Sequence, residues 1–246
     1  MADAAPQTNW FERSLERLLE DSRRFFWDAV MAIKLNHITG DYVEFGSWGG
    51  KSLAIAYETL RASDEARHLW AFDSFQGLPE AISAHDEHPS WGSGGRFVGM
   101  GTDVGGGDDP TARGLREFHE SCARFGVPRS AYTTVVGYYE DSLPALGATE
   151  APADIALAYI DCNMHSSTVT VLEFLEPRLK HGMIVAFDDY SVWSPQDVSG
   201  QRRALHDFAR DHPEWSFQPF RDVHWGGRSF VVERTSLLEP PAPGAS

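Results

Sequence analysis

Apolar and polar residues follow one another along this chain in blocks that predict an α/β fold. Short apolar runs predict five buried strands, at residues 42–45, 69–73, 132–136, 155–160 and 183–187. Residues with helical apolar spacing predict helices around them, at 10–37, 51–62, 109–125, 166–180 and 195–211. The last apolar segments, 215–220 and 229–233, alternate apolar with other residues and predict an antiparallel hairpin. We therefore expect a Rossmann-like, doubly wound and mostly parallel sheet that ends in this hairpin.

The predicted elements form one domain, residues 10–237, between two segments expected to be disordered, 1–9 and 238–246. Residues 10–40 should hold one or two helices that cover the sheet edge, with a dimer contact as the alternative. The helix after the fourth strand should be capped by Ser166 or Ser167 and kinked at Pro177.

One long segment, residues 81–110, has no periodicity and carries eight glycines between Gly92 and Gly107. Loops of this length inside a compact domain are lids or insertions. The segment follows the second strand directly, where a ligand is expected, which favours a lid.

Composition restricts the class of partner. The 246 residues are 42% hydrophobic, which suits a globular domain, and the formal net charge of −15 opposes nucleic acid as a partner. Two cysteines without zinc or disulfide spacing are typical of a reducing cytoplasm. No apolar run approaches the roughly 18 residues of a membrane span, so we expect a cytoplasmic protein with a small-molecule partner.

The segment VEFGSWGGKSL at 43–53 predicts a strand, a glycine turn and a helix. Gly46, Gly49 and Gly50 would let backbone N–H groups approach an anionic group at the helix N-terminus. A dinucleotide fingerprint would need glycines where Trp48 and Lys51 stand, so that alternative fails twice.

A phosphate-binding loop is the closer alternative, because Gly50, Lys51 and Ser52 match its end. Its opening glycine would fall at Phe45, one position short. A methyltransferase turn needs only a short glycine bend for the amino-acid end of S-adenosylmethionine, followed by an acid that ends the second strand and binds the ribose. Asp73 is that acid.

Three further acids follow the fourth and fifth predicted strands. Asp161 ends one strand, and Asp188 and Asp189 end the next. Adjacent parallel strands lie about 5 Å apart, so these carboxylates should meet and repel unless a cation joins them. Oxygen ligands favour Mg²⁺, with Mn²⁺ or Ca²⁺ as alternatives. For the Asp188–Asp189 pair alone, a helix cap or solvated turn is the competing explanation.

Five segments together resemble the macrocin O-methyltransferase family: VEFGSWGGKS, AFDSFQGLPE, GYYEDSLP, IDCNMHSST and VAFDDY. The match runs from about residue 25 to residue 234. The resemblance implies a class I S-adenosylmethionine-dependent enzyme that uses a divalent metal to methylate sugar hydroxyls of natural products.

The resemblance also implies the site residues. Glu44, Gly46, Ser47 and Gly49 would surround the methionine end, Asp73 the ribose, and Gly137, Tyr138, Asp141 and Ser142 the adenine. Further cofactor contacts would come from Ser52, Ser74, Phe75 and Asp161. The metal ligands would be Asp161, Asp188 and Asp189.

One departure from the family affects catalysis. Where the family commonly has D-x-D-x-Y, this chain has Asp161, Asn163 and His165. Asn163 cannot take a proton, although it could be a neutral ligand of the metal or substrate. His165 has a suitable pKa for the general base, with a solvated first-turn histidine as the alternative. We expect Asp161, Asn163 and His165 to carry catalysis together.

The sequence therefore predicts a metal-assisted O-methyltransferase that acts on a small, glycosylated acceptor. We expect it to be a homo-oligomer, specifically a dimer, in which the N-terminal helices offer a contact. The alternatives are a nucleotide-dependent phosphotransferase that uses Gly50, Lys51 and Ser52, and a non-catalytic S-adenosylmethionine-binding paralogue. The acceptor and the methylated hydroxyl do not follow from the sequence.

Overall fold

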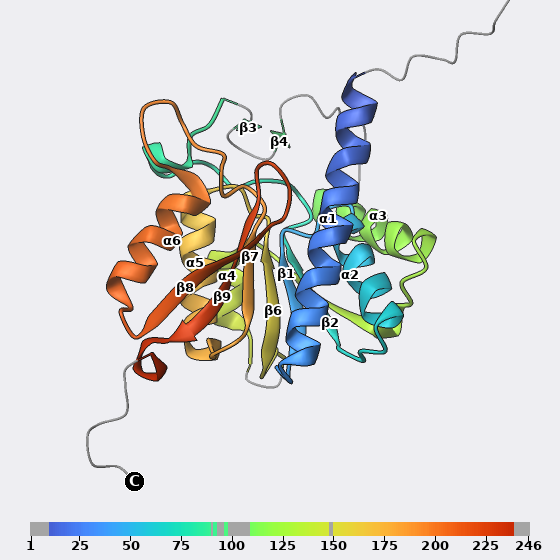
Figure 1. Cartoon of the computed structure of the whole chain (residues 1–246). Helices are drawn as coiled ribbons and strands as arrows, with labels where there is room; N and C mark the ends of the chain where they lie inside the picture. Colours follow the sequence, from blue (N-terminus) through green and yellow to red (C-terminus); the bar gives the residue numbers. More distant parts are fainter. Residues whose placement is uncertain (1–9, 90, 93–95, 98–108, 148–149, 239–246) are drawn as a thin grey trace, which may run out of the picture.

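A computed structural model describes residues 10–89, 91–92, 96–97, 109–147 and 150–238. Its main sheet has seven strands in the order β5-β2-β1-β6-β7-β9-β8 (Figure 1). The parallel strands are β1 Asp41–Phe45, β2 Leu69–Asp73, β5 Tyr132–Val136, β6 Ile155–Ile160 and β7 Ile184–Phe187. The antiparallel hairpin is β8 Trp215–Asp222 and β9 Arg228–Arg234. The predicted doubly wound fold is confirmed.

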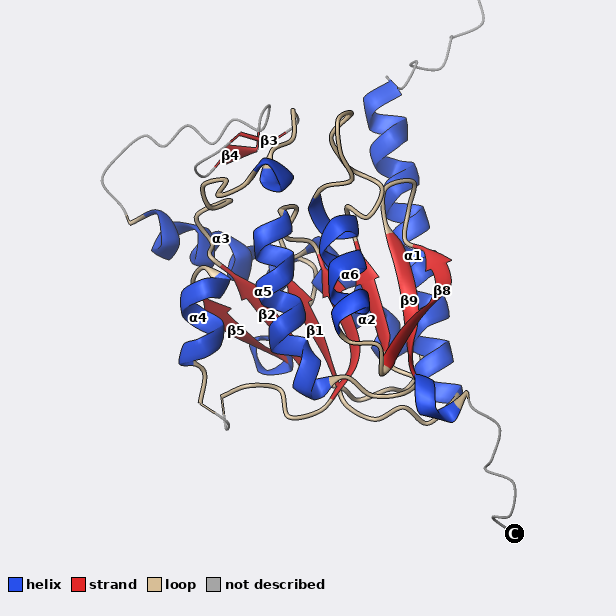
Figure 2. Ribbon diagram, turned by 90° about the vertical axis from the view of Figure 1, so that its left-hand side faces the viewer, coloured by secondary structure: helices blue, strands red, loops and turns tan. Residues whose placement is uncertain are grey.

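Helices cover both faces of the sheet (Figure 2). One layer holds α1 Trp10–Leu35, α2 Lys51–Ala62 and α3 Pro110–Arg124. The opposite layer holds α4 Tyr139–Ala145, α5 His165–Leu175 and α6 Gly200–Asp211. Short 3₁₀ turns lie at η1 Ala84–Asp86, η2 Arg129–Ala131, η3 Glu176–Arg178 and η4 Thr235–Leu237.

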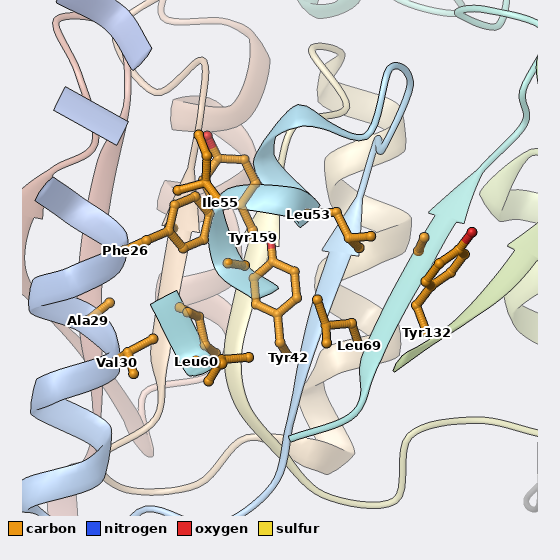
Figure 3. Close-up of a cluster of buried hydrophobic side chains, with 14 of the residues drawn as sticks. Phe26, Ala29, Val30, Tyr42, Leu53, Ile55, Leu60, Leu69, Tyr132 and Tyr159 are labelled. Carbon is orange, nitrogen blue, oxygen red and sulfur yellow. The ribbon is translucent and has the colours of Figure 1, made fainter. Parts of the chain in front are cut away.

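The core under α1 explains where this helix lies. Because side chains alternate along a strand, Tyr42 of β1 and Tyr159 of β6 point to the same layer, and Phe26 of α1 packs between them (Figure 3). The ring centroids of Phe26 and Tyr159 are 5.3 Å apart. Since β1 and β6 are central strands, α1 covers the middle of the sheet, and the prediction of an edge cover is wrong in position.

The start of α5 differs from the prediction. The N-cap is Met164 and the helix begins at His165, so Ser166 and Ser167 lie in the first turn and cap nothing. The N–H of Ser166 instead donates to Asp86 Oδ1 at 2.7 Å. A distant carboxylate thus replaces the predicted local serine cap.

The ends of two helices also differ from the prediction. α5 ends at Leu175 and continues as the η3 turn, which contains Pro177. α6 begins at Gly200 rather than Pro195, because Ser194 Oγ accepts the N–H groups of Gln196 and Asp197 and closes a turn there.

The segment 81–110 holds structure that the sequence did not predict. It contains η1 and a small antiparallel pair, β3 Trp91–Gly92 with β4 Arg96–Phe97. Residues 90, 93–95 and 98–108 of the proposed lid fall outside the described residues, as do residues 1–9 and all but the first residue of the segment 238–246 that was expected to be disordered. α4 was also not predicted. None of the described helices has the length and apolar character needed to span a membrane.

Candidate active site

The carboxyl ends of β1, β2, β6 and β7 meet at one edge of the sheet. The strand registers pair Phe45 with Phe72 and with Ile160, and Ile160 with Phe187. The glycine turn, Asp73 and the three further aspartates each follow one of these strands. The topology therefore brings the predicted residues of the cofactor and metal sites to one edge, where doubly wound folds bind ligands.

Gly46 allows the ends of β1 and β6 to approach closely. Its φ is +94°, and a Cβ added here would lie 1.9 Å from the carbonyl oxygen of Asp161. The N–H of Gly46 donates to the Phe72 carbonyl at 2.8 Å, and that of Gly50 to the Ser47 carbonyl at 2.7 Å. These two N–H groups are therefore used within the protein, and the approach of other backbone N–H groups of the turn to an anionic ligand stays a prediction. Gly46 and Gly50 shape the turn.

Glu44 is a buried acid beside this turn. The Tyr42 hydroxyl donates to Glu44 Oε2 at 2.5 Å, while Glu44 Oε1 and Ser47 Oγ are buried without a hydrogen bond of normal geometry. Burial raises the pKa of Glu44 to about 7. The hydroxyls of Tyr42, Ser47 and Ser52 act in the opposite direction and limit this rise. Buried polar atoms rarely stay unpaired, so this corner suits a polar, cationic ligand group.

Asp73 is fixed by the backbone on both sides. Its Oδ2 accepts the N–H of Trp48 at 2.9 Å, and its Oδ1 accepts the N–H of Phe75 at 2.6 Å. Both donors have positive φ, +20° and +55°, a costly conformation for large side chains that occurs in turns and clusters at functional sites. Burial raises the pKa of Asp73, and these N–H groups oppose the rise. Each oxygen keeps a lone pair for a further donor.

Residues 137–142 lie beside Asp73, as expected for one site. The N–H of Gly137 donates to the Asp73 carbonyl at 3.0 Å, and Tyr138 is the N-cap of α4. Ser142 Oγ donates to the Gly137 carbonyl at 3.4 Å, whereas Asp141 is exposed on the first turn of α4.

Three of the other predicted cofactor residues make hydrogen bonds or packing contacts within the protein. Ser74 Oγ donates to the Gly77 carbonyl at 2.8 Å and closes the turn after β2. Phe75 is buried and packs on Phe118 of α3. Gly49 accepts a hydrogen bond from Ser121 of α3 at its carbonyl, so α3 supports the glycine turn.

Asp161, Asp188 and Asp189 form a compact acidic cluster. Each offers one oxygen, and these three atoms lie within 4.8 Å of one another. Burial, followed by the charges of Asp188 and Asp189, raises the pKa of Asp161 well above its usual value. Burial and the charge of Asp188 raise the pKa of Asp189 to about 7. A divalent cation would relieve both penalties, and the donor set is the one that Mg²⁺ prefers.

Polar groups from distant elements hold two of these acids. Asp188 Oδ1 accepts from the Tyr159 hydroxyl and lies 3.0 Å from Nε2 of His224. The N–H of Asp189 donates to Gln201 Oε1 at 2.9 Å. Sequence reasoning missed Tyr159, Gln201 and His224, because no local pattern marks them. Only the VHWGG loop offered a signal, since its glycines permit close approach to another segment.

Asn163 touches the acidic cluster and has a φ of +58°. Its Nδ2 donates to Asp189 Oδ2 at 2.8 Å. The structure therefore brings Asn163 together with Asp189 as a hydrogen-bond donor.

The neighbours of His165 differ from those of Asn163. Its ring lies 5.3 Å from that of His85, and Asp86, Arg203 and Asp207 are its other charged neighbours. Burial lowers the pKa of His165. Asp86, which caps α5, also accepts the N–H groups of Ile82 and Ser83, so the start of the segment 81–110 is tied to α5.

Exposed tryptophans surround this edge of the sheet. Trp48, Trp193 and Trp225 are 65%, 42% and 77% exposed. The guanidinium of Arg202 lies 5.7 Å from the ring centroid of Tyr190 and 5.3 Å from that of Trp193. Exposed aromatic side chains in loops beside a site can supply apolar contacts to a ligand.

Comparison with known structures places this architecture among methyltransferases. The O-methyltransferase NovP superposes with a TM-score of 0.65 at 19% identity, covering 87% of this chain and 80% of NovP. The calicheamicin methyltransferase CalS11 gives a TM-score of 0.59 at 24% identity, covering 91% of this chain and 80% of CalS11. These likenesses concern the fold.

Sequence relatives agree with this placement. A tetracenomycin-derivative 4'-O-methyltransferase of Streptomyces olivaceus, whose name specifies a dimethoxy-rhamnosyl substrate, is 30% identical over 79% of this chain and 65% of its own length. The mycinamicin III 3''-O-methyltransferase of Micromonospora griseorubida is 27% identical over 71% of this chain and 62% of its own length. The matches thus span less than two thirds of these relatives.

A family model described as a methyltransferase domain matches residues 43–190, the segment that runs from the glycine turn to the acidic cluster. The relatives confirm the resemblance to the macrocin O-methyltransferase type. The chain belongs to the methyltransferase domain family, with a class I, Rossmann-like fold.

Proposed function

We propose that this protein is an S-adenosylmethionine-dependent, metal-assisted O-methyltransferase that acts on a hydroxyl of a small glycosylated natural product. One observation carries the proposal. The Asp161 carbonyl packs against Gly46 of the cofactor turn, while the Asp161 carboxylate belongs to the acidic cluster. A methyl donor on the turn and a hydroxyl at the cluster would therefore be neighbours, as transfer requires.

The cofactor half is argued from its unpaired and anchored groups. Glu44 Oε1 and Ser47 Oγ offer partners for the cationic amino group of the methionine end. Asp73, held by two backbone N–H groups, would accept both ribose hydroxyls with its remaining lone pairs. Gly137, Tyr138 and Ser142 would border the adenine, since Gly137 is bonded to the end of β2.

The metal half of the site, which would also hold the acceptor, is formed by Asp161, Asp188 and Asp189. These three residues would bind the divalent cation. Bound there, such an ion orients a hydroxyl and stabilises the alkoxide. Asn163 orients Asp189 through its amide. His165, the first residue of α5 and two positions beyond Asn163, is the candidate base, and burial lowers its pKa, which favours the imidazole form that accepts a proton.

Trp193, Trp225 and Arg202 would contact the rest of the acceptor. Indole and guanidinium planes pack well against sugar and aromatic rings. The names of the two relatives give a rhamnosyl-tetracenomycin and mycinamicin III as their substrates, and this supports a related acceptor class. The net charge of −15 favours such an acceptor over a polyanion.

Calorimetric titration of the purified protein with S-adenosylmethionine and with ATP tests the cofactor. We expect S-adenosylmethionine to bind and ATP not to bind. Binding of ATP alone would favour the phosphotransferase that uses Gly50, Lys51 and Ser52. A screen of glycosylated acceptors for the mass of one added methyl group then tests turnover, and binding without turnover on any acceptor would favour the non-catalytic paralogue.

A further inference from the structure

The loop between β8 and β9, residues 223–227, is folded tightly onto the end of β7. The N–H of Val223 donates to the Gly227 carbonyl at 3.0 Å, and the N–H of Ser191 donates to the Gly226 carbonyl at 2.7 Å. A Cβ added to Gly227 would lie 2.9 Å from the Asp188 carbonyl oxygen. Glycine is thus required for this approach, which brings the loop against the acidic cluster.

This loop fixes the orientation of the His224 side chain. His224 is 7% exposed, and its Nδ1 accepts the N–H of Gly226 at 3.0 Å. Because Nδ1 acts as an acceptor, the ring proton belongs on Nε2. Nε2 lies 3.0 Å from Asp188 Oδ1, so His224 donates a hydrogen bond to that oxygen.

Tyr159 supplies a second donor to the same atom. Its hydroxyl, at the carboxyl end of β6, donates to Asp188 Oδ1. The ring is 2% exposed and lies 5.3 Å from Phe26 and 6.3 Å from Phe25, both on α1. A tyrosine hydroxyl carries its proton at neutral pH, so it acts as the donor in this contact.

These two contacts make the oxygens of Asp188 unequal. A carboxylate oxygen has two lone pairs, and both lone pairs of Oδ1 are used by Tyr159 and His224. Oδ2 is the oxygen left for a further partner. Outer hydrogen bonds of this kind commonly orient metal-binding carboxylates.

We infer that Tyr159 and His224 are positioning residues that hold Asp188 Oδ1 so that Oδ2 binds the divalent cation as a single-oxygen ligand. This inference rests on the proposed metal-assisted function. It assigns a role in the active site to the β8–β9 hairpin, which lies outside the segment matched by the family model. It also links α1 to the metal site through the packing of Phe26 on Tyr159.

Metal binding to the full chain tests the inference without an acceptor. The affinities for Mg²⁺, by calorimetry, and for Mn²⁺, by electron paramagnetic resonance, are measured for wild type, Tyr159→Phe, His224→Phe and His224→Gln. Loss of an outer hydrogen bond typically weakens metal binding about 10- to 100-fold, and we expect this loss for Tyr159→Phe and His224→Phe. His224→Gln should recover part of the affinity, because its amide can donate to Oδ1.

Tyr139→Phe is the matched control. Tyr139 is also a buried tyrosine, but its hydroxyl donates to the Phe72 carbonyl, and its removal should leave metal affinity unchanged. S-adenosylmethionine affinity, measured on each variant, reports whether the fold is intact. For a folded Tyr159→Phe and His224→Phe, metal affinities within twofold of wild type would overturn the inference. If wild type binds neither metal, the metal-assisted function fails and the inference fails with it.

Discussion

The two halves of the candidate site are held in place by different means. On the cofactor side, Asp73 is anchored by the backbone N–H groups of Trp48, in the glycine turn after β1, and of Phe75, two residues beyond Asp73. On the metal side, Asp188 and Asp189 are anchored by side chains of β6, α6 and the β8–β9 loop. The cofactor half is therefore anchored by backbone N–H groups, whereas the metal half is anchored by side chains from three other elements.

This difference suggests a division of labour. A backbone-anchored half tolerates side-chain change around it and suits a ligand that stays the same. The metal half is held by side chains and loops, so single substitutions can change it. This suits an acceptor that differs from one enzyme to the next. If the division is real, substitutions on one side should leave the other side nearly unaffected.

The largest effect is expected from Asp188→Asn, which removes a negative ligand of the cation. Methyl transfer should fall by at least about 100-fold, because ligands matter more than the outer residues that orient them. S-adenosylmethionine affinity, measured by calorimetry, should stay within a few fold. Chelation of the wild type should have the same pair of effects, and Mg²⁺ should restore activity. A parallel loss of cofactor affinity would show that the two halves are not separate.

Asp73→Ala tests the cofactor half. Charge-assisted hydrogen bonds to the ribose contribute about 1.5–3 kcal/mol, so S-adenosylmethionine should bind more than about tenfold more weakly. Metal affinity should not change. Glu58→Ala, an exposed acid on α2, is the control and should leave cofactor affinity at the wild-type value. Unchanged affinity in a folded Asp73→Ala protein would remove Asp73 from the cofactor site.

The pH dependence of cofactor binding tests Glu44. Its pKa is about 7 in the folded protein against 4.5 normally, so the ionised side chain costs stability, and that cost appears as pH rises from about 4.5 through 7. Below pH 7 the carboxyl becomes neutral and loses its attraction for a cationic amino group. S-adenosylmethionine should therefore bind about tenfold more weakly at pH 6 than at pH 8.

Glu44→Gln should remove most of this pH dependence, because an amide does not ionise. Affinities at pH 6 and pH 8 that differ equally in wild type and Glu44→Gln would assign the effect to another group, such as Asp73, whose pKa burial also raises.

The smallest effect is expected at the exposed rim. Aromatic stacking contributes about 0.5–1.5 kcal/mol, so Trp225→Ala and Trp193→Ala should each raise the acceptor KM about two- to twelvefold. The rate at saturation and cofactor affinity should not change. Trp27→Ala is the control, since Trp27 is 47% exposed on α1. Equal KM values in all three variants would show that the acceptor does not use these tryptophans.

The two halves also differed in how far the sequence could predict them. β1, β2, α2 and the position of Asp73 follow from local apolar patterns and a glycine turn, and the structure agrees with them almost residue for residue. The meeting of Asp161 with Asp188 and Asp189 followed from the adjacency of parallel strands. Both predictions depend on the spacing of apolar residues and on the order of strands and helices, and both of these can be taken directly from the sequence.

Three of the misses share a physical cause. The N-cap of α5 was assigned to a nearby serine, but the capping group is Asp86, about 80 residues earlier in the chain and brought there by η1. Tyr159 read as an ordinary strand residue, and His224 as part of a turn, because each acts through a partner distant in sequence. A pattern of near neighbours does not contain such contacts.

Methyl transfer with and without metal tests the central claim most directly. The protein is incubated with S-adenosylmethionine and a panel of glycosylated natural products, in Mg²⁺ or in excess chelator, and the products are analysed by mass. The account predicts addition of a methyl group to an acceptor hydroxyl in Mg²⁺ and none in chelator, while calorimetry shows S-adenosylmethionine bound in both. Equal methylation in chelator by metal-free protein would contradict it.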